Sequence, residues 1–301
     1  MTYRTFKELI ESRKGGGSSR KVAVACAADE HTLEAVTKAE DDGICVPLLV
    51  GDGEAIGAIL RQLGRDPAGY EICPEADSRK ACECAVRLVR EGRADFLMKG
   101  MVDTSLFLKA VVDKANGLGT GGLMSHFALF EIPTYHKLLA PIDGGMVAYP
   151  TLDQKRQIIQ SAVDVMLKMG FDAPKVGVLA CAEKVNPKMP ETVEAAELAR
   201  MNREGIIRGC IVEGPVSYDC AMSAEIAREK GYQSAIAGDV DLLLAPNIHA
   251  GNIMGKMLTV TCGAKMAGFI MGALCPVIMT SRGASAEEKY LSLAISASVA
   301  K

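Results

Sequence analysis

Residues 151–181 read TLDQKRQIIQSAVDVMLKMGFDAPKVGVLAC, and this stretch decides the fold class. Apolar side chains recur at helical spacing in its first half, and Gly170 ends that pattern. The run Lys175–Cys181 is continuously apolar after its first residue, as expected for a strand that is buried on both faces. Pro190 then begins a second helical pattern, which ends at Gly205. A buried strand between two helices is typical of a parallel sheet that is covered by helices.

Similar apolar runs recur on both sides of this stretch and alternate with helical patterns. These runs are Val22–Ala27, Val46–Val50, Asp95–Met98, Cys210–Val212, Asp241–Ala245 and Pro276–Thr280. Most of them are too continuous for half-exposed strands, so we expect buried central strands. The predicted fold class is therefore α/β, with mainly parallel sheets and helices on both faces.

The chain length favours two lobes, because 301 residues exceed the size of most single domains. Prolines and glycines cluster at residues 133–150 and again at residues 276–283, where chain crossings between lobes are expected. We predict a first lobe of residues 1–137 with residues 282–301, and a second lobe of residues 138–281. A small-molecule active site is expected in the cleft between two such lobes.

Composition argues against several classes of protein. The formal net charge is −3 and no run of Lys and Arg exceeds two residues, so a nucleic acid partner is not expected. The uncharged stretch Met266–Thr280 is interrupted by Gly268, Gly272 and Pro276, and it is shorter than the roughly 20 residues that span a bilayer. The charged, amphipathic segment Phe6–Ile10 does not resemble a signal peptide, so we expect a cytoplasmic protein with no membrane partner.

Metal ligands are not predicted at the places where acidic or thiol groups lie close together in the sequence. Cys82 and Cys84 are two residues apart on a predicted helix and point to different faces. Asp239 and Asp241 alternate on a predicted strand, so we expect them on opposite sides. The ten cysteines are scattered along the chain and are expected to be reduced thiols.

One segment matches the dinucleotide fingerprint G-x-G-x-x-G by its letters alone. It is Gly117–Gly122, which follows the helical pattern Asp103–Ala115 and precedes the apolar run Leu123–Phe130. The fingerprint requires a strand before it and a helix after it. We therefore expect a glycine turn after a helix.

Three loops that contain Gly or Pro directly follow predicted buried strands, where open α/β sheets bind ligands. They are Gly214–Asp219, Pro246–Asn252 and Thr280–Glu288. In the third loop Arg282 offers a planar fork of donors for phosphate, Ser281 a hydroxyl and Glu288 a carboxylate. A structural explanation stays open for each loop, because Asp219 and the amides of the second loop can cap helices. Ser285–Glu288 likewise matches the capping box S-x-x-E.

At these residues the chain resembles the phosphate acetyltransferase and phosphate butyryltransferase family. The matching motifs are Leu97–Thr104, Ala182–Pro187, Gly214–Pro215, Gly238–Asp241, Ala245–Asn247, Ala250–Ile253, Pro276–Val277 and Ser281–Gly283. The first three look more like the butyryltransferase branch. The resemblance covers nearly the whole chain and is weakest in roughly the first 90 residues.

The resemblance implies a two-lobed fold similar to that of isocitrate dehydrogenases, a homodimer or higher homo-oligomer, and no metal or redox cofactor. The implied reaction converts a short-chain acyl-CoA, butyryl or acetyl, and inorganic phosphate into an acyl phosphate and coenzyme A. The implied catalytic residues are Ser281, Arg282 and Glu288, where Glu288 occupies the position of a family aspartate. Substrate-binding roles are expected for Lys109, Gly214, Pro215, Asn247, Gly251, Asn252 and Gly283; Lys109 lies one residue from the register of a family arginine.

A direct mechanism fits these groups. The coenzyme A thiol has a pKa of about 8.5, so it needs a base to become a thiolate at neutral pH, and Glu288 is the candidate. Thiolate attack on the acyl group requires no covalent acyl-enzyme. Three alternatives stay open: a lyase or hydratase acting on an acyl-CoA, a metal-dependent dehydrogenase on a similar fold, and a non-catalytic coenzyme A-binding protein.

Overall fold

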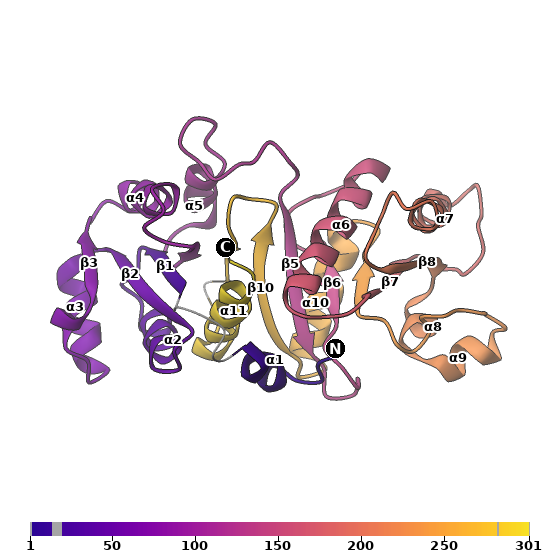
Figure 1. The fold of residues 1–301 in the computed structure, drawn as a ribbon, viewed down its shortest axis with the longest axis horizontal. Coiled ribbons are helices and arrows are strands. Elements are labelled where there is room, and N and C mark those ends of the chain that lie inside the picture. The colour runs from indigo at the N-terminus through magenta and orange to yellow at the C-terminus, as the bar shows by residue number, and fades with distance from the viewer. Residues whose placement is uncertain (1, 14–19, 282, 301) are drawn as a thin grey trace. The chain divides into compact units, whose positions relative to one another are not determined.

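A computed structural model describes residues 2–13, 20–281 and 283–300 (Figure 1). The predicted α/β class is confirmed, because helices alternate with mainly parallel strands along most of the chain. The chain forms two compact units. Unit 1 comprises residues 1–9 and 123–266, and unit 2 comprises residues 10–122 and 267–301. Each unit contains a sheet and its own helices.

The observed boundaries of the units differ from the predicted ones. In both the prediction and the structure, the C-terminal helix belongs to the same unit as the N-terminal part of the chain. The chain passes into unit 1 after residue 122 and leaves it after residue 266, whereas residues 137 and 281 were expected. The difference arises because the last strands of the chain belong to unit 2. Strands β10 (Lys265–Met271) and β11 (Val277–Ile278) pair with each other, and β11 pairs with β4 (Phe96–Lys99).

Unit 2 contains a largely parallel sheet with the strand order β3-β2-β1-β4-β11-β10. The remaining strands are β1 (Arg20–Ala25), β2 (Cys45–Gly51) and β3 (Glu71–Pro74). All described pairs in this unit are parallel except β10 with β11. Its helices are α2 (Glu30–Asp41), α3 (Gly53–Gln62), η1 (Pro67–Gly69), α4 (Ser78–Arg90), α5 (Thr104–Val111) and α11 (Ala286–Val299), while α1 (Phe6–Arg13) crosses the boundary between the units.

Aspartate side chains start the four helices α2 to α5. Asp29, Asp52, Asp77 and Asp103 are the N-cap residues, and each carboxylate accepts a hydrogen bond from a backbone N–H in the first turn of its helix. Such a cap satisfies a donor that the helix itself cannot pair, and its negative charge interacts favourably with the helix dipole. The starts of these helices are therefore fixed by local sequence.

The strand order of unit 2 reverses at β1. The chain runs from β1 to β2 and β3 on one side, then returns to place β4 on the other side of β1. Ligands of open α/β sheets bind at the carboxyl ends of the strands beside such a reversal. Gly100 follows β4 at this point, and a Cβ atom there would lie 2.3 Å from the Cys26 carbonyl oxygen. Residue 100 must therefore be a glycine for the two strand ends to approach.

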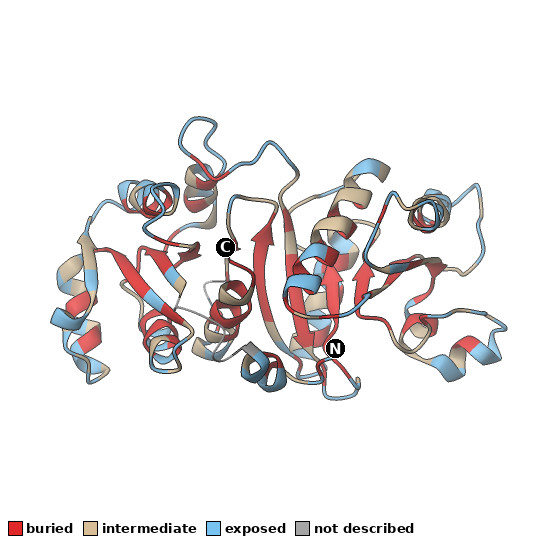
Figure 2. Cartoon of the chain, in the orientation of Figure 1, coloured by how far each residue is buried: buried red, intermediate tan, exposed pale blue. Residues whose placement is uncertain are grey.

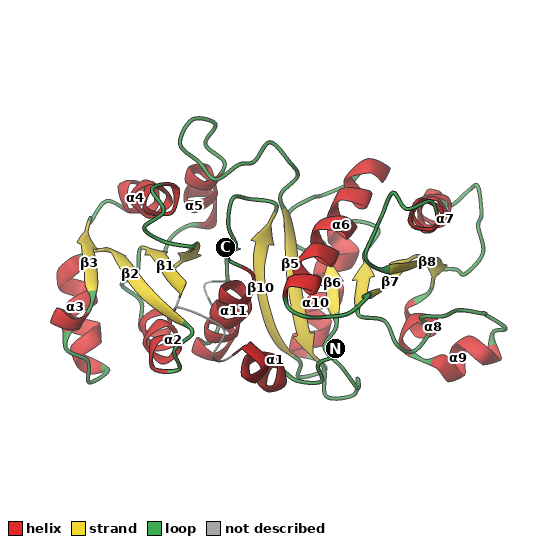
Figure 3. Cartoon of the chain, in the orientation of Figure 1, coloured by secondary structure: helices red, strands yellow, loops and turns green. Residues whose placement is uncertain are grey.

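Unit 1 contains a parallel sheet in the order β6-β9-β7-β8. Its strands are β6 (Ala140–Ile142), β7 (Lys175–Leu179), β8 (Ile211–Val216) and β9 (Leu242–Leu244), and β5 (Ser125–Glu131) contacts the start of β6 in antiparallel fashion. Its helices are α6 (Leu152–Lys168), α7 (Pro190–Arg203), α8 (Tyr218–Met222), α9 (Ala224–Glu229) and α10 (Ile248–Val260), as Figure 3 shows. The predicted helix after Thr151 starts with a complete capping box of Thr151 and Gln154.

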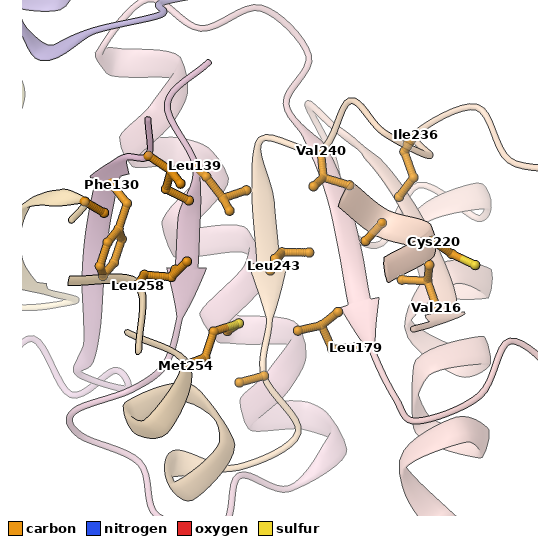
Figure 4. Close-up of a cluster of buried hydrophobic side chains, with 14 of the residues drawn as sticks. Phe130, Leu139, Leu179, Val216, Cys220, Ile236, Val240, Leu243, Met254 and Leu258 are labelled. Carbon is orange, nitrogen blue, oxygen red and sulfur yellow. The ribbon is translucent and has the colours of Figure 1, made fainter. Parts of the chain in front are cut away.

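The sheet of unit 1 is covered by an apolar core. Figure 4 shows Leu243 of β9, Leu179 of β7 and Val216 of β8 among buried side chains from the neighbouring elements. Figure 2 shows that the strands are mostly buried, while the helices combine buried and exposed positions. The predicted burial is confirmed for most of the continuous apolar runs, but it is wrong for Cys210–Val212, where Ile211 is exposed.

Besides β5, which the sequence analysis noted only as the apolar run Leu123–Phe130, three strands in the described part of the chain were not predicted. The first, β3, is only partly buried. In β6, Pro141 fell in a proline- and glycine-rich stretch that suggested a boundary. The third, β10, overlaps a longer uncharged stretch that we interpreted only as core. The segment Gly117–Gly122 is followed by β5 instead of a helix, as predicted. Within the described residues, no helix combines the length and the apolar character needed to cross a membrane.

The prediction that Asp239 and Asp241 point to opposite sides is wrong. Lys137 Nζ lies 2.8 Å from an Asp239 carboxylate oxygen and 2.7 Å from one of Asp241. Strand alternation does not apply because Asp239 and Asp241 precede β9, and the N–H of Asp239 forms a turn with Ile236. Lys175 Nζ also pairs with Asp239, at 2.5 Å. The carboxylates therefore lie around ammonium groups at the amino end of β9.

This ion-pair cluster should stabilise the fold in a pH-dependent way. The Lys137 side chain is 3% exposed and that of Asp241 is 8% exposed. Burial alone would raise the pKa of Asp239, but hydrogen bonds from Lys137, Lys175 and His136 outweigh it and hold this pKa below its usual range. We expect Lys137→Met to lower the free energy of unfolding by about 3 kcal/mol at pH 7, because the Asp241 carboxylate would lose its buried partner.

The pH dependence gives an independent check of the cluster. A depressed carboxyl pKa contributes stability above the unfolded-state pKa of about 3.9, and this contribution is lost as the pH falls through the folded-state value. Thermal unfolding between pH 7 and pH 3 should therefore show a shallower loss for Lys137→Met than for the wild type. Lys188→Met, at an exposed position, serves as the control. Equal stability of the two variants would contradict the structural role of Lys137.

Candidate active site

The loop after β11 carries the predicted catalytic residues of unit 2. Strand β11 pairs with β4, and β4 lies next to β1, where the strand order reverses. The loop therefore follows a strand close to this reversal. Ser281 is exposed, and its carbonyl accepts a hydrogen bond from the Ala284 N–H at 3.1 Å. Gly283 is exposed, and an added Cβ would meet none of the described residues beyond its chain neighbours within 4 Å. Arg282 lies outside the described residues.

Glu288 lies in the first turn of α11, three residues after the N-cap Ser285. The Ser285 hydroxyl accepts a hydrogen bond from the Glu288 N–H at 3.2 Å, so the predicted cap is present. The adjacent Lys289 is buried, with Nζ 3.4 Å from the Ala284 carbonyl oxygen and 3.9 Å from an Asp29 carboxylate oxygen. The start of α11 is thus anchored, and it holds the partly buried Glu288 in a defined turn after Ser281.

Lys109 lies on α5, which begins directly after the end of β4. Its side chain is exposed and makes no hydrogen bond or ion pair within the parts of the chain that the structure describes. An unpaired ammonium on this helix is available to an anionic ligand. Unit 2 therefore presents Ser281, Glu288 and Lys109 on elements that start at the carboxyl ends of neighbouring strands.

In unit 1 the predicted substrate-binding residues after β9 connect the loop after β9 to the loop after β6. Asn247 caps α10, and its side-chain oxygen accepts a hydrogen bond from the Ala250 N–H at 3.1 Å. The Asn252 amide donates to the Gly144 carbonyl at 3.0 Å. A Cβ on Gly251 would lie 2.5 Å from the Asp143 carbonyl oxygen. These contacts hold the loop after β9 against the loop after β6, its neighbour in the sheet.

The loop after β6 was not predicted as part of a site. Its Asp143 is buried, and its carboxylate accepts hydrogen bonds from three backbone N–H groups at 2.8 to 3.1 Å. A Cβ on Gly145 would lie 3.1 Å from the ring of His126 on β5, so this ring packs closely against the glycine. Burial lowers the pKa of His126, and the nearby Asp143 only partly opposes this shift. The sequence Asp143-Gly144-Gly145 was the available signal, but it was assigned to a lobe boundary.

Gly214 and Pro215 are not in a loop, contrary to the sequence prediction. They lie within β8, which continues to Val216. A Cβ on Gly214 would be 2.8 Å from the Val178 Cβ, so this glycine permits close packing of β8 on β7. Their position is explained by sheet packing.

One cluster could hold a metal by its chemistry. Glu183, Asp219 and Cys220 place ligand atoms within 4.8 Å of one another. Lys230 Nζ already lies 3.1 Å from Glu183 and 2.8 Å from Asp219. Hydrogen bonds from Lys230 and then Ser217 lower the pKa of Asp219 to about 2. The ammonium group supplies the positive charge, so these residues fit an ion-pair cluster better than a metal site.

An apolar groove of about 700 Å³ opens at the carboxyl ends of β7 and β9 in unit 1. Its lining includes Cys181 after β7, Pro246 after β9, and the exposed side chains of Ile253 and Met257 on α10. The groove adjoins the capped loop at Asn247 because Pro246 and Ala250 belong to both.

Comparison with known proteins assigns this chain to a family. Residues 75–297 match the family model described as "Phosphate acetyl/butaryl transferase". The chain is 43% identical over 297 residues to phosphate butyryltransferase of Clostridium acetobutylicum, covering 99% of this chain and 98% of the relative. It is 42% identical over 295 residues to phosphate acetyltransferase of Thermotoga maritima, covering 97% and 98%.

A solved structure supports the same assignment. The crystal structure of a branched-chain phosphotransacylase from Enterococcus faecalis V583 matches with a TM-score of 0.80 and 30% identity, covering 93% of this chain and 99% of that one. The chain belongs to the phosphate acetyl and butyryl transferase family. The resemblance found in the sequence motifs is therefore confirmed.

The loops after β9 and β6 in unit 1 approach so closely that residue 251 must be a glycine, and a substitution can test this. Gly251→Ala would place Cβ against the backbone of Asp143 and Gly144, so we expect a loss of about 2 kcal/mol in unfolding free energy. Gly255→Ala on the same helix is the matched control, because the nearest contact of its Cβ among the described residues is the Phe130 ring, at an ordinary 3.5 Å. That variant should be as stable as the wild type or more stable, since alanine favours helix. Chemical denaturation measures both, and equal effects would refute the steric argument.

Proposed function

We propose that this protein is a phosphate acyltransferase that converts a short-chain acyl-CoA and inorganic phosphate into an acyl phosphate and coenzyme A. Membership of the family over most of the chain carries this proposal. The acyl group proposed is butyryl or acetyl, because similar relatives are named for each. The position of Ser281 after β11, close to the strand reversal, is consistent with ligand binding there.

The proposed chemistry, written toward acyl-CoA, is a direct transfer. The coenzyme A thiol gives its proton to the Glu288 carboxylate, and the sulfur forms a bond to the carbonyl carbon of the acyl phosphate. The bond between that carbon and the phosphate oxygen then breaks, and phosphate leaves with its charge paired to Arg282. Backbone N–H groups of the glycine-containing loops stabilise the intermediate oxyanion. Ser281 donates a hydrogen bond to the phosphate, and no covalent acyl-enzyme forms.

The remaining predicted residues take supporting roles in this proposal. Lys109 attracts an anionic part of the substrate through its unpaired ammonium group. Gly283 leaves space for a ligand beside the loop, because no atom of the described residues beyond its chain neighbours lies within 4 Å of its added Cβ. Asn247, Gly251 and Asn252 set the loop after β9. Gly214 and Pro215 contribute through the packing of β8, where they lie.

The same proposal covers cofactors, partners and location. Coenzyme A acts as a substrate, and no metal or redox cofactor takes part. The carboxylates that a dehydrogenase could have used as ligands, Asp239 and Asp241, already pair with Lys137. We propose a cytoplasmic homodimer or higher homo-oligomer that binds neither nucleic acid nor membrane. Exposed Ile253, Met257 and Val260 at helical spacing on α10 are apolar surface that an assembly could cover.

Thiol release from acyl-CoA tests the proposed reaction directly. Butyryl-CoA and acetyl-CoA should each release free thiol only when phosphate is present, with butyryl-CoA at least as good a substrate as acetyl-CoA. The reason is that phosphate is the acyl acceptor. Detection of free thiol with and without phosphate measures this. Thiol release that does not depend on phosphate would indicate a hydrolase and would contradict the proposed reaction.

Substitution of Glu288 separates its proposed catalytic role from the helix cap. Glu288→Gln keeps a side chain that is compatible with the first turn of α11 but removes the base. We expect turnover to fall about 100-fold or more while the unfolding free energy changes by no more than about 0.5 kcal/mol. Steady-state kinetics and chemical denaturation measure the two effects.

Two matched substitutions complete this test. Glu288→Asp keeps a carboxylate and should recover part of the lost rate, since the family position accommodates aspartate. Glu287→Gln changes the neighbouring exposed carboxylate and should retain wild-type turnover. Wild-type turnover in Glu288→Gln would show that the residue serves the helix alone.

A further inference from the structure

A buried lysine lies at the start of α11, directly after the proposed base. Lysine and arginine side chains are usually exposed. Those that line a groove of about 790 Å³ between α4 and α5 follow this rule: they are Arg79, Arg87, Arg90 and Lys109. The Lys289 side chain, by contrast, is only 4% exposed, although the proposed transfer does not use it. A buried ammonium group loses its hydration, so its burial needs a compensating interaction.

Within the described residues, the Lys289 ammonium group contacts two polar groups. Its Nζ donates a hydrogen bond to the Ala284 carbonyl oxygen at 3.4 Å and lies 3.9 Å from an Asp29 carboxylate oxygen. An exposed ion pair of this length would be weak, but the Asp29 side chain is only 11% exposed, so water screens this pair less. The Asp29 carboxylate also accepts hydrogen bonds from the N–H and the hydroxyl of Thr32, at 2.9 and 2.5 Å. The first turn of α2 therefore holds Asp29 in place, and Lys289 reaches it from α11.

The two groups that Lys289 contacts lie on either side of β4. Asp29 follows β1 and Ala284 follows β11, and the strand order in this part of the sheet is β1-β4-β11. These strands are parallel, so their carboxyl ends lie at one edge of the sheet. Lys289 therefore joins the loops of two strands that do not pair with each other, beside the end of β4.

The loop after β11 has internal hydrogen bonds that lead to the same contact. The Ala284 N–H donates to the Ser281 carbonyl oxygen at 3.1 Å, and the Ala284 carbonyl accepts from Lys289. The Ser285 hydroxyl accepts from the Glu288 N–H at 3.2 Å. The segment between Ser281 and Glu288 is therefore fixed near its middle by Lys289.

A second polar contact joins α2 and α11 without involving this loop. The Tyr290 hydroxyl donates to the Asp42 carboxylate at 2.7 Å, and Lys38 Nζ lies 4.7 Å from the centre of the Tyr290 ring. The two helices also pack against each other. Docking of α11 on α2 thus has other sources, so it does not by itself explain why an ammonium group is buried at residue 289.

We propose that Lys289 is a positioning residue, which ties the loop after β11 to the start of α2 and so sets where the Glu288 carboxylate lies relative to Ser281. This inference rests on the proposed acyl transfer, in which Glu288 takes the proton and Ser281 contacts the phosphate. Lys289 acts through these two residues and touches no substrate. A displacement of about 1 Å can lower the rate of a direct transfer about 100-fold, so the tie has a large effect on turnover.

Lys289→Met tests the tie, because methionine fills a similar space without the ammonium group. We expect kcat to fall about tenfold or more, while the KM for acyl-CoA stays within about twofold. The thermal midpoint should stay within about 5 °C of the wild type, because the lost ion pair is long and Asp29 keeps its hydrogen bonds to Thr32. Steady-state kinetics and thermal unfolding measure these effects, and an unchanged kcat would overturn the proposal.

A double-mutant cycle identifies the group through which Lys289 acts. In the Glu288→Gln background, the addition of Lys289→Met should lower kcat by no more than about threefold, because the base is already absent. A residue that supports only the fold would lower kcat equally in both backgrounds, and that result would refute the positioning role. Asp29→Asn keeps a good cap for α2 but removes the negative charge, so it should also lower kcat. Wild-type kcat in Asp29→Asn would contradict the tie to α2.

Tyr290→Phe is the matched control, because it removes the other polar contact between α2 and α11 and leaves the loop after β11 untouched. It should keep wild-type kcat, while its thermal midpoint falls by about 3 °C. A loss of turnover as large as that of Lys289→Met would show that docking of α11 in general controls the rate, and would overturn the specific role of Lys289.

Hydrogen exchange separates this inference from the proposed reaction, because it needs no turnover. The Ala284 and Glu288 N–H groups are hydrogen-bonded, so Lys289→Met should speed their exchange about tenfold or more, and Tyr290→Phe should not. Phosphate-dependent turnover that Lys289→Met leaves unchanged, with unchanged exchange, would leave the reaction standing and refute the tie. Faster exchange in Lys289→Met, with no phosphate-dependent turnover in the wild type, would support the tie and refute the reaction.

Discussion

The close approach of β1 and β4 at Gly100 is the constraint on which unit 2 depends. A side chain at residue 100 would collide with the Cys26 carbonyl at 2.3 Å, so only glycine allows the strand ends to lie together. This approach lies where the strand order reverses, and β11 pairs with the other side of β4. The loop that bears Ser281 and the helix that bears Lys109 both start from this arrangement. Backbone proximity thus determines where the side chains of the candidate site can lie.

Unit 1 uses a similar device at a different place. Gly251 and Gly144 let the loops after β9 and β6 touch through their backbones, and Asn252 adds a hydrogen bond across the contact. The buried Asp143 carboxylate is satisfied by three N–H groups of its own loop. These polar groups at the edge of the sheet therefore hold the loops after β6 and β9 in place.

Two charged clusters in unit 1 contain carboxylates that could bind a metal ion, but these carboxylates form ion pairs with lysines. Glu183 and Asp219 surround Lys230, and Asp239 and Asp241 surround Lys137. From the sequence, the second pair suggested metal ligands that strand alternation would separate. The structure brings them together because they lie in the turn before β9, where alternation does not operate. Their partner Lys137 is about 100 residues away in the chain, so no local pattern could reveal it.

The sequence by itself determined the α/β class, the positions of most buried strands, the helix caps at Asn247 and Ser285, and the family to which the chain belongs. These features follow from local periodicity, capping and short motifs, all of which act within a few residues. Only the tertiary structure decided that β10 and β11 join unit 2, that Gly214 packs inside β8, and that α4 and α5 enclose a cationic groove. The first two depend on contacts between segments that are separated in the chain, and the third depends on how two successive helices pack; such contacts leave no periodic signal in either segment alone.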